Sequence, residues 1–407
     1  DYDAFCATFI HTEGTELSAL LQKIDAHGLE RLASSLKNDM GCTILALCIS
    51  SNNRPKISTM MGGMNVHLDI LFDDATVWLA RIPRTTAVTP PQDIQDHILR
   101  SEYATLSWLH RIGFPAPAVY GYGLAAHPNI AGVGYMIMEK LEASPLHWPG
   151  LSSDQRYHVL RQLAQLYLTL EHHSFDRAGS IYPEDTVGAF ADPIAYEVDD
   201  DQIRLLGPFD TLREHLDQTI RLYLRLIEAS EWAVDDPISS FLIYRSLLDA
   251  YPHILGDLLD SNQFYLRHQD DKGDHILVND RLDIVGIIDW EWSKVVAKLF
   301  AFSAPVMLLP DAFLEGSNEL SQEEEDFATI FEYLQRSDMA GYIRNGRVCH
   351  RITFILDTGD RIDDCKPHLK GLYEFLGEVN WEWEAWRSGA LERYHGDPIL
   401  QLLMARV

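Results

Sequence analysis

Three short apolar runs in the second half of the chain are bounded by turn-forming and charged residues. The runs are Phe264–Leu266, Ile276–Val278 and Ile284–Ile288. Their length and boundaries predict consecutive strands of a small buried ribbon, with a polar loop crowded with His and Asp after the first strand. Because a hairpin folds its two ends together, we expect Asp270 and Asp289, at opposite ends of this segment, to lie close to each other.

The first third of the chain mixes helical and strand periodicity. Apolar residues recur at a spacing near 3.6 in some segments and alternate with polar residues in others, which distinguishes amphipathic helices from half-buried strands. The expected elements are one or two helices over Thr15–Leu36, a strand hairpin over 66–81, a helix over Asp93–Arg111 and a strand over Gly134–Leu141.

Helical patterns dominate after about residue 150, although the segment Ser174–Pro208 reads as loop-rich. Ser152 and Gln155 form a capping box, which predicts a helix that begins there and ends near His173. Further helices are predicted over Thr211–Glu228, Ser239–Asp257, Gln322–Arg336 and Pro367–Gly377. The chain is therefore predicted to be α+β, with a small sheet-rich lobe over residues 1–141 and a mainly helical lobe over 142–407 that contains the hairpin 264–292.

The composition is that of a soluble globular protein, with 46% hydrophobic and 23% charged residues. The 61 Asp and Glu against 33 Lys and Arg give a formal charge of −28. Such a surface repels phosphate backbones and anionic lipids, so neither nucleic acid nor a membrane is an expected partner. It would steer a cationic substrate inward, although solubility alone also explains it. The five scattered cysteines lack a C-x-x-C pair and no apolar run is long enough to span a membrane, so a cytoplasmic protein is expected.

Two facing carboxylates suit phosphoryl transfer, in which one orients the attacking hydroxyl and another holds Mg2+ on the nucleotide phosphates. The His268-x-Asp270 loop, the two apolar strands after it and the Asp-Trp-Glu-Trp sequence over 289–292 resemble the aminoglycoside phosphotransferase family, most closely its fungal-type branch. The resemblance implies a bilobal protein-kinase-like fold. It also implies an enzyme that uses ATP and Mg2+ to phosphorylate a hydroxyl of a small molecule.

The resemblance also implies roles for residues of the loop and the strands that follow it. Asp270 corresponds to the catalytic base, Asp289 to the main metal ligand and His268 to the residue that braces the loop. One position departs from the family pattern, because His275 stands where the family has a metal-binding Asn. Mg2+ prefers oxygen ligands to imidazole, so we expect Asp274 or Asp271 to supply the missing oxygen.

In the first lobe, the resemblance implies a nucleotide-binding surface. Gly62 and Gly63 correspond to the loop that covers the nucleotide. Arg81, held by Glu102, corresponds to the cation that binds the α and β phosphates. The backbone around Met138 and Glu139 corresponds to the hinge that hydrogen-bonds adenine. Each of these residues also has a simpler interpretation as an ordinary turn, strand or salt-bridge residue.

Three other functions remain open from the sequence. The departure at His275 is compatible with a kinase-fold protein that binds ligands but has lost catalysis. It is also compatible with a biosynthetic enzyme, in fungal-type secondary metabolism, that uses His and Asp for acid–base chemistry without phosphate. Lastly, His268, Asp270 and His275 superficially match a two-His-one-carboxylate iron site.

The C-terminal tail carries three tryptophans among carboxylates. Trp381, Trp383 and Trp386 lie close together in the sequence, beside Glu382 and Glu384. Aromatic faces next to carboxylates can enclose a cationic substrate. The spacing fits the packing of a terminal helix at least as well, and both interpretations stay open from the sequence.

Overall fold

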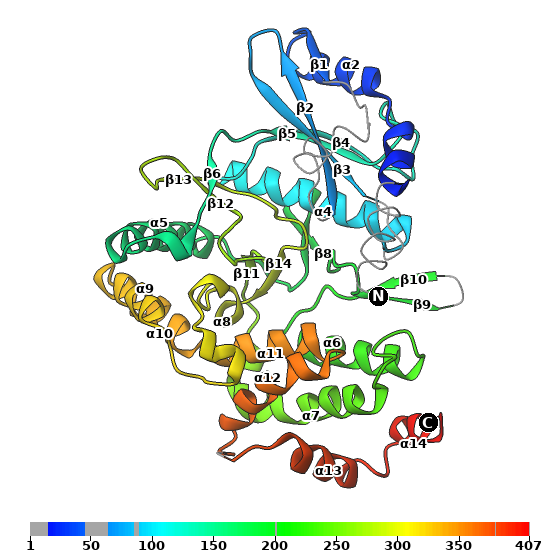
Figure 1. Ribbon diagram of the computed structural model, residues 1–407, viewed down its shortest axis with the longest axis vertical. Coiled ribbons are helices and arrows are strands. Elements are labelled where there is room, and N and C mark those ends of the chain that lie inside the picture. Colours follow the sequence, from blue (N-terminus) through cyan, green and yellow to red (C-terminus); the bar gives the residue numbers. More distant parts are fainter. Residues whose placement is uncertain (1–14, 45–63, 85–88, 200–201, 379, 407) are drawn as a thin grey trace, which may run out of the picture.

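An antiparallel sheet forms the upper part of the molecule in Figure 1. The computed structural model describes residues 15–44, 64–84, 89–199, 202–378 and 380–406, and the statements below concern these residues. The sheet has the order β1-β2-β3-β5-β4. Its strands are β1 (Cys42–Ile44), β2 (Asn65–Phe72), β3 (Val77–Pro83), β4 (Val119–Gly123) and β5 (Tyr135–Glu139). The predicted hairpin is confirmed as β2 and β3.

The alternation of side chains along β3 decides what each face of the sheet contacts. Trp78, Ala80 and Ile82 join a hydrophobic cluster with the helices that precede the sheet, residues 15–23 and α2 (Ala26–Leu36). Because successive side chains of a strand point to opposite faces, Arg81 lies on the other face, toward α4 (Gln92–Arg111). The apolar pattern of β3 thus places one cation opposite a helix.

Helices form the lower part of the molecule (Figure 1) and share one large hydrophobic core. They are α5 (Ser153–Glu171), α6 (Leu212–Glu228), α7 (Pro237–Leu255), α8 (Lys298–Ala301), α9 (Gln322–Tyr333), α10 (Ser337–Asn345), α11 (Arg347–Thr358), α12 (Ile362–Glu374), α13 (Trp383–Arg393) and α14 (Pro398–Arg406). The capping box predicted at Ser152 and Gln155 is present at the start of α5. Among the described residues, no helix has the length and apolar character needed to cross a membrane.

The predicted ribbon is confirmed for its second and third strands and is wrong for its first. β11 (Phe264–Arg267) pairs with β14 (Lys294–Ala297), whereas β12 (Ile276–Val278) pairs with β13 (Ile284–Ile287) on one side and with β6 (Ser144–Pro145) on the other. The three runs were identified correctly as strands. Apolar periodicity predicts that a strand exists but carries no information about its partner, and β6 and β14 are too short and mixed to stand out in the sequence.

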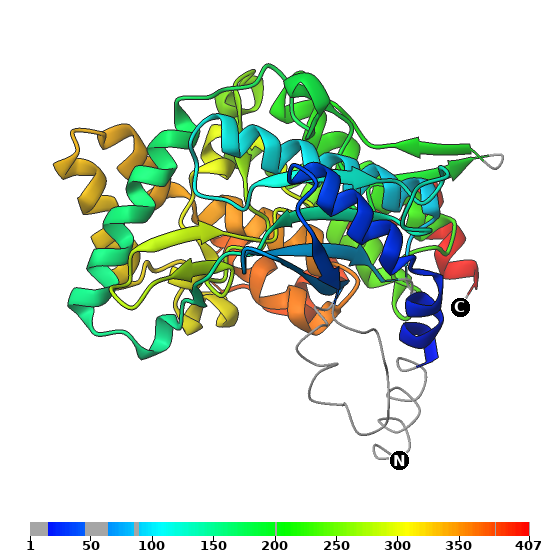
Figure 2. The same cartoon turned by 90° about the horizontal axis from the view of Figure 1, so that it is seen from above.

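Two further expectations need correction. The predicted helix Gln322–Arg336 ends at Tyr333, because Gln335 adopts a positive φ of 59°, and two unpredicted helices, α10 and α11, follow. The segment expected to be loop-rich contains two short hairpins. These are β7 (Ser180–Tyr182) with β8 (Thr186–Gly188), and β9 (Tyr196–Asp199) with β10 (Gln202–Leu205). The second hairpin projects from the molecule in both Figure 1 and Figure 2.

The tryptophans of the tail pack against one another. The rings of Trp383 and Trp386 stack with their centroids 5.1 Å apart, and Trp381 lies 6.0 Å from Trp386. The ammonium group of Lys366 lies 5.2 Å from the centroid of the Trp383 ring, so the chain itself supplies a cation to this ring. The structure therefore supports packing of α13 rather than a cage at this place.

Candidate active site

His268 fixes the loop between β11 and β12. Its Nε2 donates to the carbonyl of Ile288 at 2.9 Å, and its Nδ1 accepts the backbone N–H of Asp270 at 3.1 Å. Burial lowers the pKa of His268, so the ring is neutral and each nitrogen has one role. Because both nitrogens are already bonded, His268 has no lone pair left for a metal. The two-His-one-carboxylate iron site is therefore not formed.

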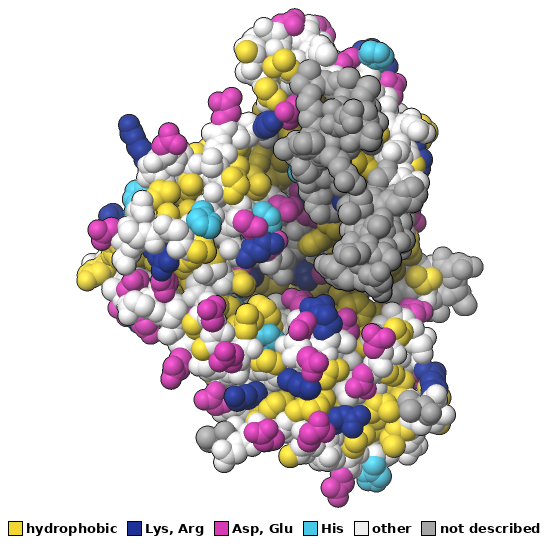
Figure 3. Space-filling view, viewed as in Figure 1, with side chains coloured by type: hydrophobic (Ala, Val, Ile, Leu, Met, Phe, Trp, Pro, Cys, Tyr) yellow, Lys and Arg dark blue, Asp and Glu magenta, His cyan; other side chains and the backbone are white. Residues whose placement is uncertain are grey.

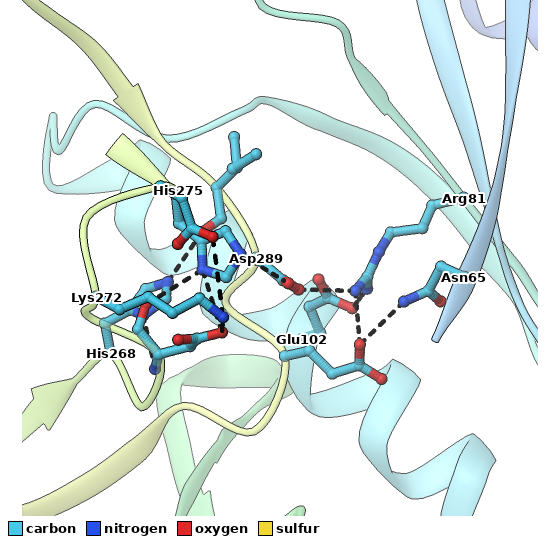
Figure 4. Close-up of polar contacts among 11 residues, drawn as sticks. Asn65, Arg81, Glu102, His268, Lys272, His275 and Asp289 are labelled. Atoms are coloured by element: carbon cyan, nitrogen blue, oxygen red, sulfur yellow. Dashed lines mark hydrogen bonds and ion pairs between the residues drawn. The ribbon is translucent and has the colours of Figure 1, made fainter. Parts of the chain in front are cut away.

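The hairpin β12–β13 brings Asp270 and Asp289 into contact with the two ring nitrogens of one residue, His275 (Figure 4). Ile276 pairs with Ile287 across the hairpin, so the residues just outside that pair are neighbours. His275 lies between the two carboxylates: its Nδ1 is 3.6 Å from Asp270 Oδ2 and its Nε2 is 3.5 Å from Asp289 Oδ2. The predicted proximity of the two aspartates is confirmed. Asp289 has a left-handed backbone, with φ of 63°, a conformation that Asp tolerates better than most residues.

Arg81 joins the sheet to this hairpin. One guanidinium nitrogen donates to Glu102 on α4, and the other donates to Asp289 Oδ1 at 2.9 Å and to Glu291 Oε2 at 2.6 Å. Asn65 on β2 donates to the same oxygen of Glu291 at 3.0 Å. Figure 4 shows these side chains converging from the sheet, α4 and the end of β13. The predicted Arg81–Glu102 pair is thus present, and it extends to two further carboxylates.

The electrostatics of this cluster are unbalanced, because one guanidinium serves three carboxylates. Burial would lower the pKa of Arg81, but Glu102, Glu291 and Asp289 outweigh that effect and raise it. Burial raises the pKa of Glu102, and the two neighbouring carboxylates raise it further against the opposing effect of Arg81. Burial and the nearby Arg81 lower the pKa of His67 to about 4, so this neighbour adds no positive charge. The cluster therefore has room for another cation.

Lys272 supplies a positive charge on the other side of His275. Its Nζ lies 2.9 Å from Asp270 Oδ2 and 3.9 Å from Asp274 Oδ2. The hydrogen bond to Asp270 raises the pKa of Lys272. The sequence interpretation missed this lysine and also Glu291. The only feature of the sequence that could have identified these two residues is their position, because each lies two residues after an aspartate of the motif.

Asp271 does not contribute to the metal-binding group predicted for this loop. Its Oδ2 accepts from Arg267 at 3.0 Å and its Oδ1 accepts the backbone N–H of Val306 at 2.9 Å. Arg267 also donates to the carbonyl of Phe300 and to the Ser303 hydroxyl. This ion pair ties the loop to the segment after α8, so Asp271 acts as an anchor.

The donor set fits Mg2+ only in part. Asp270, Asp274 and His275 offer donor atoms that all lie within 4.8 Å of one another, and Asp289 adds a carboxylate next to His275. Carboxylate oxygens are suitable magnesium ligands. The imidazole of His275 is not, and Lys272 already lies among the carboxylates on the Asp270 side. Asp289 is the residue best placed to hold a cation.

The remaining predicted residues lie in the sheet or outside the described part of the chain. Met138 and Glu139 lie at the end of β5, where the N–H of Glu139 donates to the carbonyl of Ala118 at 2.8 Å. That N–H is therefore used within the sheet and cannot bind adenine in this conformation. Gly62 and Gly63 fall outside the described residues.

A cavity of about 80 Å3 opens beside the loop, between the β14 strand and helices α6 and α11. Gln269, immediately before Asp270, is one of its lining residues. Its polar lining includes Lys294, which lies 2.6 Å from Asp192 Oδ2, and Asp357, which is exposed to solvent. Although the residue as a whole is exposed, the surrounding protein desolvates its carboxyl group and raises the pKa of Asp357 to about 6. Figure 3 shows acidic, basic and histidine side chains gathered around the hollow between the sheet and the lower helices.

Known structures share this architecture. A candidate aminoglycoside phosphotransferase from Ralstonia eutropha is 13% identical with a TM-score of 0.50, and the match covers 88% of this chain and 100% of that one. A candidate fructosamine-3-kinase from Thermobifida fusca is 14% identical with a TM-score of 0.50, covering 84% of this chain and 99% of that one. At such identities the likeness concerns the fold alone, and it confirms the predicted α+β, kinase-like class. No curated protein matches the chain.

The family itself is identified by a sequence match that spans more than half of the chain. The match covers residues 73–295, from the turn of the β2–β3 hairpin to the start of β14. It includes Arg81, which contacts Glu102 and Asp289, and also Asp270, which His275 joins to Asp289. The chain is therefore a member of the phosphotransferase enzyme family that includes the aminoglycoside phosphotransferases.

Proposed function

We propose that the protein is an ATP-dependent phosphotransferase that acts on a hydroxyl of a small molecule. One observation carries the proposal. Asp289 contacts Arg81 through Oδ1 and faces His275 through Oδ2. His275 in turn lies next to the Asp270 carboxylate. A cation from the sheet and the two carboxylates of the hairpin thus meet at one point. This arrangement suits phosphoryl transfer, which depends mainly on positioning and charge neutralisation.

Each residue of the cluster has a role in this proposal. Asp270 accepts the proton of the attacking hydroxyl, while Lys272 holds its carboxylate in place. Arg81, oriented by Glu102, binds the nucleotide phosphates. Asp289 holds a divalent cation, which when bound would neutralise the charge that develops on the phosphates. The predicted adenine contacts then fall to backbone groups beyond Glu139, at the end of β5.

The cavity beside Gln269 is the proposed acceptor site. The lining carries two carboxylates, Asp192 and Asp357, and two cations, Lys294 and Arg267. Because Lys294 pairs with Asp192 and Arg267 pairs with Asp271, the Asp357 carboxylate is the group that favours a cationic acceptor. Among the described residues, the Asp357 carboxylate makes neither a hydrogen bond nor an ion pair, and it is available to an ammonium group. The two similar structures are named for phosphotransfer to an aminoglycoside and to fructosamine, both small molecules.

Other parts of the sequence interpretation stay proposals. They are the assignment to the fungal-type branch, a role in secondary metabolism, a cytoplasmic location, and the division into lobes at residues 1–141 and 142–407. The second of the two lobes would carry both the catalytic loop and the acceptor cavity. This division is consistent with β6, which pairs with the hairpin strand β12 immediately after the boundary.

Calorimetric titration with ATP, with and without a divalent cation, tests the proposal directly. We expect binding that strengthens when the cation is present. Asp289→Asn should lose the cation-dependent part of the affinity. Asp270→Asn should bind ATP within about threefold of the wild type but lose at least about 100-fold in turnover, because general-base catalysis contributes about that much.

Asp283→Asn is a matched control for both variants. Asp283 lies at the far turn of the same hairpin, where it contacts Asn279 and His158, and its loss should change neither binding nor turnover. Turnover is followed as ADP release with amino-bearing and neutral hydroxyl acceptors. Absence of ATP binding under both conditions would refute the proposal. Cation-dependent binding without turnover on any acceptor would favour a binding protein that has lost catalysis.

A further inference from the structure

The two ring nitrogens of His275 have different neighbours. Nδ1 lies 3.2 Å from the carbonyl oxygen of Asp270, close enough for a hydrogen bond. A carbonyl only accepts, so Nδ1 is the ring nitrogen that carries a proton here. Nε2 is then the nitrogen that can offer a lone pair, and it faces Asp289 Oδ2 at 3.5 Å. Metal-binding histidines commonly donate their other N–H to a backbone carbonyl in this way, which fixes the ring orientation.

His275 Nε2 and Asp289 Oδ2 face each other, and both atoms can bind one cation that lies between them. The separation of 3.5 Å between His275 Nε2 and Asp289 Oδ2 is longer than an ordinary N–H···O bond of about 2.9 Å. It is shorter than twice a metal–ligand bond of about 2.1 Å. Asp289 is held from behind by Arg81 through its other oxygen, so Oδ2 stays directed at His275.

The opposite side of His275 is already neutralised. Lys272 lies within 2.9 Å of Asp270 and 3.9 Å of Asp274, where a second metal ion would have to displace an ammonium group. Among the described residues, Arg81 is the only basic side chain besides His275 that lies within ion-pair distance of Asp289, and it contacts the other carboxylate oxygen, Oδ1. The side chain of Asp289 is 40% exposed, which leaves room for water or phosphate oxygens as further ligands.

We infer that His275 Nε2 and Asp289 Oδ2 form a cation site that selects first-row transition ions such as Mn2+ over Mg2+. Mg2+ is a hard ion that binds oxygen and loses its water reluctantly. Imidazole suits iron, nickel, copper and zinc ions, and at a nitrogen–oxygen site the affinity rises along the series from Mn2+ to Cu2+, so Mn2+ is the weakest-binding member of the selected group. The inference rests on the proposed function only in taking this cleft as the place where the nucleotide's cation binds.

Pulsed electron paramagnetic resonance of the full chain with Mn2+ alone provides the test. A directly bound imidazole nitrogen modulates the Mn2+ signal, whereas carboxylate oxygens and water do not. We expect nitrogen modulation in the wild type, and Mn2+ binding at least about tenfold tighter than Mg2+ in a competition titration. Absence of the modulation would overturn the inference, as would equal affinity for the two ions. A doubly protonated His275 that bridges the two aspartates would give that negative result.

His275→Asn separates the nitrogen ligand from the rest of the site. We expect this variant to lose the modulation and to lower the preference for Mn2+ over Mg2+ by at least about tenfold. His158→Asn is the matched control, because His158 also faces an aspartate, Asp283 at 3.3 Å, on the surface at the far end of the hairpin. It should leave the signal unchanged. Modulation that persists in His275→Asn would also overturn the inference.

The test also separates this inference from the proposed function. A protein that binds ATP and phosphorylates an acceptor, but shows no nitrogen modulation, keeps the function and loses the His275 site. A protein that shows the modulation with Mn2+ alone, but binds no nucleotide, keeps the site and loses the function. The nitrogen signal does not depend on turnover.

Discussion

A comparison of two buried glutamates tests whether the three carboxylates around Arg81 share its positive charge. Glu102 pairs with Arg81 in the cleft, and Glu324 pairs with Arg347 at 2.7 Å in the helical part. All four side chains are almost completely buried, with exposed fractions of 7% or less. The difference lies in the surroundings, because Glu324 is the only carboxylate that contacts Arg347 among the described residues. Replacing each glutamate with glutamine removes one charge and keeps the shape.

The expected losses of stability differ accordingly. Glu324→Gln leaves a buried guanidinium without a counter-charge, which costs about 3 kcal/mol in the free energy of unfolding. Glu102→Gln leaves Arg81 with Asp289 and Glu291, so we expect it to stay within about 1 kcal/mol of the wild type at pH 7. Burial raises the pKa of Glu102 above its usual value, so the charge that this substitution removes is itself held at a cost in the folded protein.

The raised pKa of Glu102 also predicts the pH dependence. A carboxyl group whose folded pKa exceeds its unfolded pKa binds more protons in the folded state, so it stabilises the fold at low pH. That contribution is lost as the pH rises through the folded pKa. Because the folded pKa is raised, the wild type should lose stability between pH 7 and pH 9 relative to Glu102→Gln, which has no carboxyl group to ionise.

Urea unfolding followed by circular dichroism at pH 7 and pH 9 measures both effects. The three proteins should unfold with the same dependence on urea concentration, so that midpoint differences report stability. If Glu102→Gln proved as unstable as Glu324→Gln at pH 7, the sharing of Arg81 among three carboxylates would be wrong. If the difference in the free energy of unfolding between the wild type and Glu102→Gln stayed constant from pH 7 to pH 9, the raised pKa of Glu102 would be refuted.

Three further predictions concern the loop and the cavity. Asp271→Asn removes the charge partner of Arg267, which should lower turnover at least about tenfold and leave ATP affinity unchanged in calorimetry, because it loosens the loop and not the nucleotide site. Lys272→Met frees the Asp270 carboxylate, and we expect turnover to fall more than ATP affinity in steady-state assays. With its pKa raised to about 6, Asp357 gains charge as the pH rises, so KM for a cationic acceptor should fall between pH 5 and pH 7. Asp357→Asn should abolish that fall.

Hydrophobic periodicity predicted the elements better than their neighbours. The hairpin over 66–81 was predicted as such, whereas the contacts of β3 with α2 on one face and of Arg81 with α4 on the other became visible only in the structure. The same pattern gave the strand Phe264–Leu266 but assigned it to the wrong ribbon, because its partner β14 lies beyond the motif and has only four residues. Pairing depends on which apolar surfaces meet in the folded chain, and that information is not local.

The acceptor cavity could not be predicted from the sequence for a related reason. Asp192, Lys294 and Asp357 come from a loop, a short strand and a helix that are far apart in the chain. Each is an ordinary charged residue in its own segment, in a chain that has 61 acidic residues. The catalytic loop differs, because His268 and Asp270 are close in sequence and their spacing itself sets the hydrogen bonds between them.

The departure at His275 is better explained as a change of ion than as loss of the site. If the site had decayed, the contacts on both sides of the histidine would have no reason to remain in register. Instead, His275 keeps a hydrogen bond to Asp270 and faces Asp289, while Arg81 holds the other oxygen of Asp289. Each neighbouring charge of the loop is paired, Asp271 with Arg267 inside and Lys272 with Asp270 outside. The pairing leaves His275 Nε2 and Asp289 Oδ2 facing each other, which is the arrangement from which we infer the site for a transition ion.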